Sequence, residues 1–124
     1  MDDIETPVLR PLVWMGSSKK NLRAFPMGAQ KVIGDELQFI QFGGVPMDVK
    51  PLKSIGSGVF ELAPRYDSDA YRTVVAVQLG KRIYVLHAFQ KKSRKGVVIS
   101  QHDIDLIKRR YAEARELAKD DRQR

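Results

Sequence analysis

Three apolar stretches follow one another closely between positions 59 and 89, and their spacing constrains the fold more than any other feature. The stretches are Val59 to Ala63, Tyr71 to Leu79 and Ile83 to Phe89. Their length and their β-branched and aromatic residues predict strands, and the short connections predict antiparallel pairing. The middle stretch is largely apolar on both faces away from Arg72, which indicates a central strand that is covered on at least part of each face.

Helical patterns precede these strands. A short basic helix is expected over residues 19–25, where Ser17 and Ser18 offer N-terminal caps. A second helix should run from Pro26 to about Phe42, because apolar residues recur there at helical spacing before a Gly-Gly pair. Its predicted buried stripe is Ala29, Ile33, Leu37 and Ile40.

A C-terminal helix is expected from Ser100 to about Lys119. The Ser100 hydroxyl and the Asp103 carboxylate are spaced so that they can cap its first turn. The predicted buried stripe of this helix is Ile104, Ile107, Tyr111, Ala114 and Ala118. The cations that are predicted to face outward are Lys108, Arg109 and Arg110.

The remaining segments complete a plan with one domain. Val8 to Met15 is predicted to be an edge strand that Pro11 interrupts or delays, and Val45 to Gly58 is predicted to be a connecting loop. We therefore expect one α+β domain over residues 8–119, between flexible tails at 1–7 and 120–124. It should hold an N-terminal helix pair, a twisted, antiparallel-rich sheet of about four strands, and a C-terminal helix.

The charge balance favours a polyanionic partner. The chain has 22 Lys and Arg against 15 Asp and Glu, which gives a net charge of +7 and a pI near 9.8. With no cysteine and two histidines, the chain is expected to hold no metal site and no disulfide, and nothing predicts a cofactor. The acidic start is no signal peptide and no apolar run would span a bilayer, so we expect a cytoplasmic protein without membrane contact.

A dense cationic cluster follows the last predicted strand. Lys91, Lys92, Arg94 and Lys95 lie directly before Gly96. A stiff strand that delivers fixed positive charge to a sheet edge suits phosphate binding, because little reorganisation is needed to meet an anion. The alternative is a solvated basic turn that follows the strand.

The order of the elements and several phrases resemble the HigB and RelE toxins, in particular their phage-derived branch. The phrases are PLKSIGSGVFEL, AYRTVVAV and IYVLHAFQKKSRKG, and the resemblance extends from about Val8 to Leu117. It implies a RelE/ParE-like fold and the toxin component of a type II toxin–antitoxin system. It also implies a ribosome-dependent, metal-independent endoribonuclease that cuts mRNA, restrained by a cognate antitoxin with a helix-turn-helix domain. DNA would then be contacted only through the antitoxin complex.

The resemblance also assigns roles to residues. Arg72 looks like the family's phosphate-contacting arginine, and Lys91 and Lys92 match its basic pair, so these three should stabilise charge that builds on the phosphate. They are expected at the rim of the sheet, with side chains that reach solvent. Glu61 is the first candidate for the general base and His87 is the second.

Plainer interpretations accompany these roles. Arg72 can form a structural ion pair with Glu61 or Asp67, and His87 can be a hydrogen-bonded core histidine. Exposed cations in loops are usually solvated, but here they can also contact the RNA backbone. The cations expected to do so are Lys53, Arg65, Arg94 and Lys95.

Two other functions fit the same layout. ParE-like toxins resemble it and block DNA gyrase without RNA chemistry, in which case the C-terminal cations form a protein-binding surface. The other function is that of a catalytically inactive, prophage-encoded nucleic-acid-binding protein. The chain also departs from the relatives most like RelE, which end in a short segment with a tyrosine near the cut site. Tyr111 instead lies on the predicted buried stripe of a long helix.

Overall fold

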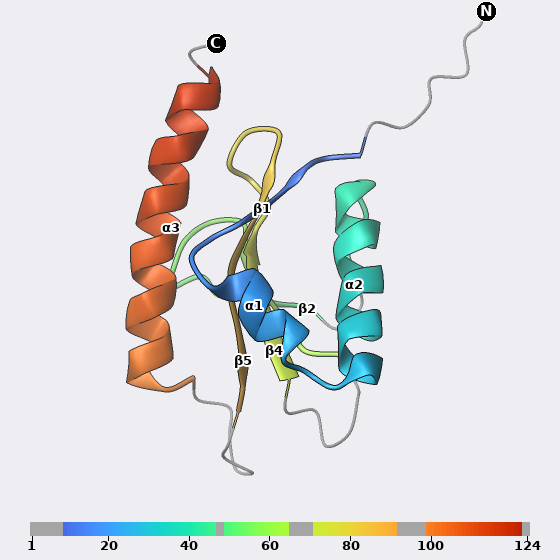
Figure 1. The fold of residues 1–124 in the computed structure, drawn as a ribbon. Helices are drawn as coiled ribbons and strands as arrows, with labels where there is room; N and C mark the ends of the chain where they lie inside the picture. The colour runs from blue at the N-terminus through green and yellow to red at the C-terminus, as the bar shows by residue number, and fades with distance from the viewer. Residues whose placement is uncertain (1–8, 47–48, 65–70, 92–98, 123–124) are drawn as a thin grey trace, which may run out of the picture.

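The computed structural model describes residues 9–46, 49–64, 71–91 and 99–122, and it has the predicted α+β class. Figure 1 shows how the helices are arranged around one sheet. In chain order the elements are β1 (Leu12–Trp14), α1 (Ser18–Arg23), α2 (Met27–Gln41), β2 (Val49–Pro51), β3 (Val59–Leu62), β4 (Tyr71–Ala76), β5 (Ile83–Gln90) and α3 (Gln101–Arg122).

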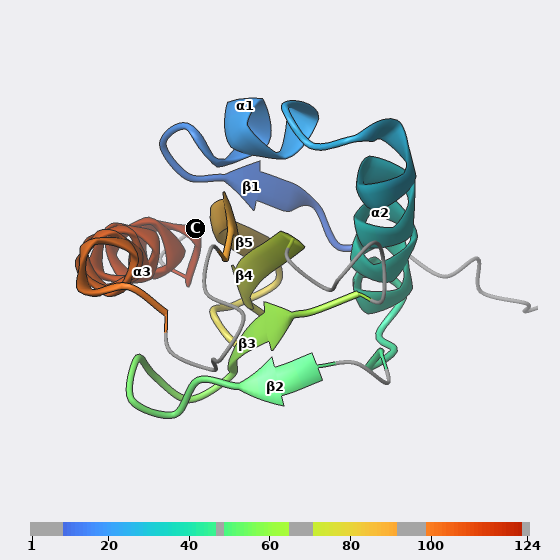
Figure 2. The ribbon, with the colours of Figure 1, turned by 90° about the horizontal axis from the view of Figure 1, so that it is seen from below.

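The sheet is mixed, with one parallel pair at its edge. Its strand order is β1-β5-β4-β3-β2. β1 pairs parallel to β5, whereas all other neighbours pair antiparallel, so the predicted meander of β3, β4 and β5 is confirmed. Figure 2 shows α2 and α3 on opposite sides of the sheet, which explains why β4 and β5 are buried over most of their length.

The apolar stripe of α2 packs on one face of the sheet. All four residues of the predicted stripe are buried. They form one apolar cluster with Leu22 and Phe25 and with alternate residues of the central strands. Neighbouring side chains on a strand point to opposite faces, so Val75 belongs to this cluster while Val74 belongs to the cluster under α3.

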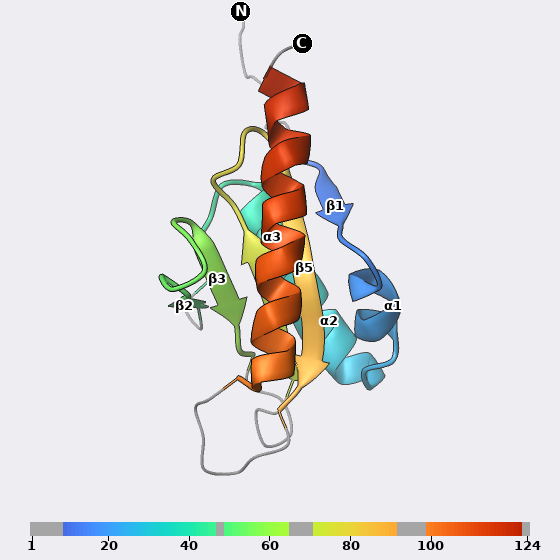
Figure 3. The same ribbon diagram turned by 90° about the vertical axis from the view of Figure 1, so that its left-hand side faces the viewer.

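Helix α3 covers the other face, as Figure 3 shows. The buried members of its predicted stripe are Ile107, Ala114 and Ala118. Ile104 and Tyr111 pack against the same cluster and are partly buried. The predicted cap is present, because Asp103 N donates to Ser100 Oγ at 3.1 Å and Ser100 Oγ donates to Asp103 Oδ2 at 2.8 Å. None of the described helices is long and apolar enough to cross a membrane.

Among the described residues the sheet has five strands rather than about four, because the predicted loop contains β2. This strand is three residues long and ends in Pro51, so it lacks the alternation of apolar and polar residues by which a strand is recognised in a sequence. It pairs with β3 at the edge of the sheet, where a proline is tolerated. β4 is shorter than predicted and ends at Ala76 instead of Leu79, while α3 extends past Lys119 to Arg122.

Ser17 and Arg110 also differ from their predictions. Within the described part of the chain, the Ser17 side chain makes no capping bond to α1, and its Oγ accepts a hydrogen bond of 3.1 Å from Arg110 Nη2. The prediction that Arg110 faces outward is wrong: the residue is buried, and its Nη1 donates to Leu86 O at 2.9 Å. These bonds tie α3 to β5 and to the turn after β1.

A bulge in β5 changes which face its residues occupy. Val74 pairs with His87 whereas Val75 pairs with Val85, so Leu86 is the extra residue. Leu86 and His87 therefore both contact the α3 side, although neighbours in a regular strand point to opposite faces. The bulge places the His87 ring beneath α3.

Candidate functional site

Glu61, Arg72 and Lys91 come together at the end of the sheet that is remote from the turn between β4 and β5. Glu61 lies opposite Val74, and Arg72 lies opposite Phe89; both partners belong to the apolar cluster under α3. Residues that lie opposite each other on antiparallel strands point to the same face, so Glu61 and Arg72 face α3. Lys91 follows β5 two positions after Phe89 and faces the same way.

These three side chains form a buried ion cluster. Glu61 Oε2 lies 3.7 Å from Arg72 Nε and 3.4 Å from Lys91 Nζ. The side chains of Arg72, Lys91 and Glu61 are 10%, 8% and 3% exposed, respectively. Among the described residues, two cations converge on one carboxylate, in surroundings where water screens their charges poorly.

This burial contradicts the expectation that Arg72 and Lys91 extend their side chains into solvent. The contact between Arg72 and Glu61 is one of the two ion pairs that the sequence allowed, and Asp67, the other partner, lies outside the described residues. Charges that lose their hydration need a partner, because an unpaired buried ion costs several kcal/mol. The ion cluster therefore contributes to the fold, whatever chemistry it performs.

His87 belongs to a second network on the same face. Its Nε2 lies 2.7 Å from Asp103 Oδ1, and its Nδ1 lies 3.4 Å from Arg110 Nη1. Because a guanidinium only donates, Nδ1 is the acceptor of that contact, and the ring proton is on Nε2, which donates to the Asp103 carboxylate. The ring stacks on Phe89 with 5.0 Å between centroids.

Burial lowers the pKa of His87 below its ordinary value of 6.5. The residue is 4% exposed, and the positive charges of Arg110 and His102 act in the same direction. The hydrogen bond and the charge of Asp103 raise the pKa but do not outweigh burial. The ring is therefore neutral at pH 7, which is the state expected of a hydrogen-bonded core histidine.

Gly16 makes room for the buried guanidinium of Arg110. Its φ is +52°, and a Cβ atom at this position would lie 2.6 Å from Arg110 Nη2. Burial, together with the neighbouring charge of Arg109, lowers the pKa of Arg110 from its ordinary value. The turn after β1 and α3 thus meet through a contact that any side chain at position 16 would obstruct.

The register of β2 adds Lys50, which was missing from the residues predicted from sequence, to the face that carries Glu61. Lys50 lies directly opposite Glu61 and is exposed. The same row across the sheet continues from Glu61 through Val74 to His87. In the sequence Lys50 lies within the predicted loop from Val45 to Gly58, and its orientation comes from the pairing of β2 with β3.

The other candidate residues lie apart from this row or outside the residues that the structure describes. Lys53 is exposed in the turn between β2 and β3. Tyr111 is partly buried, and its ring lies close to Gly56 in that turn. Among the described residues, no group of three or more His, Cys, Asp or Glu is placed to hold a metal ion. The predicted residues outside the description are Arg65, Lys92, Arg94 and Lys95.

Comparison with known proteins identifies the family to which the chain belongs. Residues 20–112 match the family described as Phage derived protein Gp49-like (DUF891). No curated protein matches the chain significantly. The matched stretch includes α2, the whole meander and the first half of α3, and hence all three residues of the ion cluster. The chain therefore belongs to the phage-derived Gp49-like family, which is a RelE/toxin-like family.

Proposed function

We propose that the chain is the toxin component of a type II toxin–antitoxin system, of the HigB kind, and that it cuts mRNA on the ribosome and so inhibits translation. The observation that carries the proposal is the ion cluster, in which Arg72 and Lys91 converge on one carboxylate. Membership of the Gp49-like family supports the toxin part of the proposal. The nuclease part rests on the chemistry that such a cluster suits.

RNA cleavage without a metal ion needs charge stabilisation and two proton transfers. The 2′-oxygen attacks the neighbouring phosphorus and forms the O2′–P bond, while the P–O5′ bond breaks. A base accepts the proton of the 2′-hydroxyl, an acid donates a proton to the leaving O5′, and negative charge builds on the phosphoryl oxygens. The products are a 2′,3′-cyclic phosphate and a 5′-hydroxyl.

In this proposal Arg72 and Lys91 stabilise the phosphoryl charge. Glu61 holds both cations near one point, so little reorganisation is needed when charge develops. The two cations of the ion cluster attract a phosphate. Glu61 is also our candidate base, because a carboxylate can accept a proton and this one lies beside the cations that would hold the phosphate. Lys92, which directly follows Lys91 in the chain, adds to the positive charge.

We assign His87 a positioning role rather than a proton transfer. Its two ring nitrogens face Asp103 and Arg110, and burial keeps the ring neutral. Asp103 connects the ring to Ser100 at the start of α3, and Arg110 connects it to the turn after β1. The network holds α3 over the sheet beside Phe89, which pairs with Arg72.

The partners in this proposal follow from charge and family. A net charge of +7 suits mRNA and ribosomal RNA, both of which are polyanions in the cytoplasm. A cognate antitoxin with a helix-turn-helix domain restrains the toxin, and contact with DNA occurs only through that antitoxin. Lys50, on the edge strand β2, and Lys53, in the turn that follows it, are both exposed. At this edge of the sheet they can contact the RNA backbone.

Tightly repressed expression followed by 5′-end mapping of cellular mRNAs tests this function. We expect new ends inside translated regions, each with a 5′-hydroxyl. Purified protein should cut naked RNA poorly, because few groups are available for acid–base chemistry and positioning on the ribosome must contribute. Growth arrest with altered DNA supercoiling and no new mRNA ends would favour ParE-like gyrase inhibition. Continued growth without cleavage would favour an inactive nucleic-acid-binding protein.

A further inference from the structure

A groove lies on the face of the sheet that α2 covers, which is the face opposite the ion cluster. Its cavity has a volume of about 220 Å³ and lies between the C-terminal end of α2 and the neighbouring strands. The apolar side chains that line it are Ile40, Val45, Pro46, Val49, Phe60 and Val77. Val45 is 72% exposed, and Phe39, whose ring packs against the groove residue Gly44, is 52% exposed. We call this surface the α2 groove.

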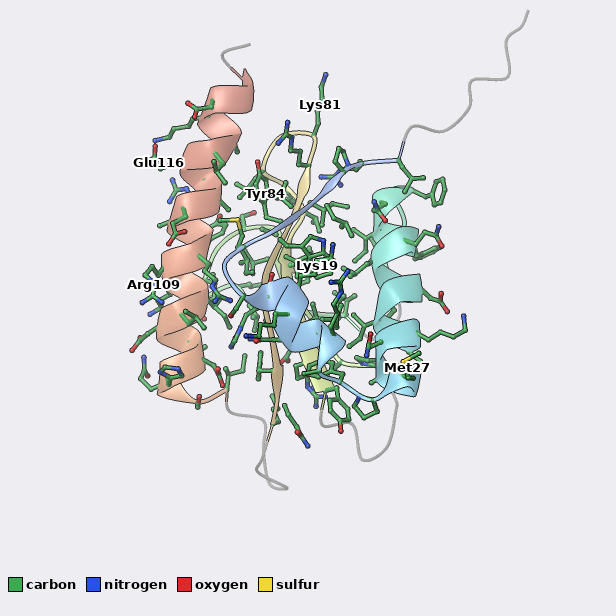
Figure 4. The ribbon with its side chains drawn as sticks, in the orientation of Figure 1. Lys19, Met27, Lys81, Tyr84, Arg109 and Glu116 are labelled. Carbon is green, nitrogen blue, oxygen red and sulfur yellow. The ribbon has the colours of Figure 1, made fainter. Side chains whose placement is uncertain are left out.

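Cations lie at one end of the α2 groove. Arg10 lines the groove and also lines an adjoining trough together with Lys81 and Arg82. Carbonyl oxygens orient the Arg10 guanidinium: Nη2 donates to Val77 O at 2.6 Å, and Nε donates to Lys81 O at 3.2 Å. Such bonds fix the guanidinium without neutralising its charge. Figure 4 shows that the Lys81 side chain points away from the protein at this end.

Among the described residues, no carboxylate lines the α2 groove or the trough beside it. An open apolar cavity next to fixed positive charge marks a surface for a partner of opposite charge. We propose that the α2 groove binds an acidic peptide segment of a partner protein. One aliphatic or aromatic side chain of the segment enters the cavity, and its carboxylates lie beside Arg10 and Lys81.

An acidic peptide fits the α2 groove better than RNA, which is also anionic. Most of the side chains that line the cavity are aliphatic or phenylalanine, with Arg10 and Gln78 as the polar exceptions. Its volume of about 220 Å³ suits one apolar side chain rather than a length of nucleic-acid backbone. Single-stranded RNA prefers a cationic track with successive stacking rings. Here the cations are gathered at one end, so a short run of carboxylates next to an apolar anchor is the complementary pattern.

This inference does not rest on the proposed RNA cleavage. Val77 borders the cluster under α2, whereas Arg72 faces α3 from the other end of the same strand region. Phe60 lines the groove and directly precedes Glu61 on β3, so these two side chains point to opposite faces of the sheet. A peptide in the α2 groove leaves the ion cluster uncovered, so loss of peptide binding and loss of nuclease activity can be observed separately.

Selection from a random peptide display library on the folded, full-length protein tests the proposal. Enriched peptides should place Asp or Glu around a Leu, Ile, Phe or Trp, and a synthetic copy should bind more weakly as salt rises. Val45→Glu puts a carboxylate at the apolar cavity, and Lys81→Glu reverses a charge in the trough. Each should weaken binding of that peptide by about tenfold or more. Both side chains are exposed, so the fold should be retained.

Met27→Glu and Lys20→Glu are the matched controls. Met27 is 81% exposed at the start of α2, away from the groove (Figure 4), and Lys20 is exposed on α1. Each control should change binding by less than about twofold. Enrichment of neutral or basic peptides would overturn the proposal, as would binding that survives both groove variants. Tighter binding of a short single-stranded RNA that is sensitive to the same variants would overturn it in favour of a nucleic-acid groove.

Discussion

Lys91 Nζ lies 3.4 Å from Glu61 Oε2, and less than a tenth of either side chain is exposed. The contact joins the end of β5 to β3 across the intervening strand β4, whose Arg72 approaches the same oxygen at 3.7 Å. One buried carboxylate thus separates two cations that would otherwise repel each other. Substitutions at this point should affect both stability and chemistry, and the two effects can be measured apart.

Glu61→Gln should destabilise the protein strongly. The change leaves Arg72 and Lys91 buried without their shared anion, and removing one partner of a buried ion pair costs about 3–5 kcal/mol. Denaturant titration measures this as a lower free energy of unfolding. Asp35→Asn is the control, because it removes the exposed ion pair with Lys31 and should cost less than about 1 kcal/mol. Equal losses in the two variants would show that the ion cluster does not hold the fold together.

Gly16→Ala and Gly34→Ala should change stability in opposite directions. At Gly16 the φ of +52° and the guanidinium of Arg110 at 2.6 Å both oppose a Cβ, so we expect a loss of about 1–3 kcal/mol. Gly34 is inside α2 with open space around it, so alanine there should add about 0.5–1 kcal/mol. Thermal and denaturant unfolding measure both effects, and a stabilising Gly16→Ala would refute the close contact with Arg110.

His87 should make stability depend on pH near neutrality. Its pKa is lowered in the folded protein, so the unfolded chain binds a proton at a higher pH than the folded chain does. The stabilisation is fully present above the unfolded pKa of 6.5 and is lost as the pH falls below that value. Urea titrations between about pH 8 and pH 5 test this. His87→Gln should flatten this slope, whereas exposed His102→Gln should keep it; a slope unchanged in His87→Gln would contradict the assignment.

Lys50→Ala should reduce RNA cleavage without unfolding the protein. Lys50 is exposed and lies opposite Glu61 on the edge strand, so its loss should change stability by less than about 0.5 kcal/mol. Removal of one cation near the RNA should lower the cleavage rate several-fold, up to about tenfold, in a translation extract. Lys20→Ala, on α1, is the matched exposed control and should keep full activity. Full activity in Lys50→Ala would mean that Lys50 is merely solvated.

The sequence predicted the elements whose pattern is local and repeated. The stripe of α2 recurs at helical spacing, and the three strands of the meander are joined by short connections, so both could be recognised without tertiary information. β2 could not be recognised, because its three residues show no alternation of apolar and polar side chains. Pairing with β3, rather than any local pattern, stabilises this strand. For the same reason the sequence did not predict which face of the sheet Lys50 points to, because its orientation is set by its pairing with Glu61.

The candidate site was predictable only in part for a similar reason. The pairing of Arg72 with Glu61 could be anticipated, because both belong to neighbouring strands of one meander. The burial of Arg110 could not, since it follows Lys108 and Arg109 in what looks like a solvated basic run. Its partners are the carbonyl of Leu86 at the bulge and the turn at Ser17, which are distant in sequence and leave no local signal.

Cleavage by Lys91→Gln tests most directly whether the ion cluster acts on RNA. Arg72 remains beside Glu61 in this variant, so the buried carboxylate keeps a cation and the protein should stay folded. Mapping of mRNA 5′ ends in a translation extract, at equal concentrations of folded wild type, Lys91→Gln and the control Lys20→Gln, measures the rate. We predict a loss of about 2–4 kcal/mol of transition-state stabilisation in Lys91→Gln alone, which is tens to hundreds of fold in rate. The same cuts at the same rate from folded Lys91→Gln would contradict the assignment of the ion cluster as the active site.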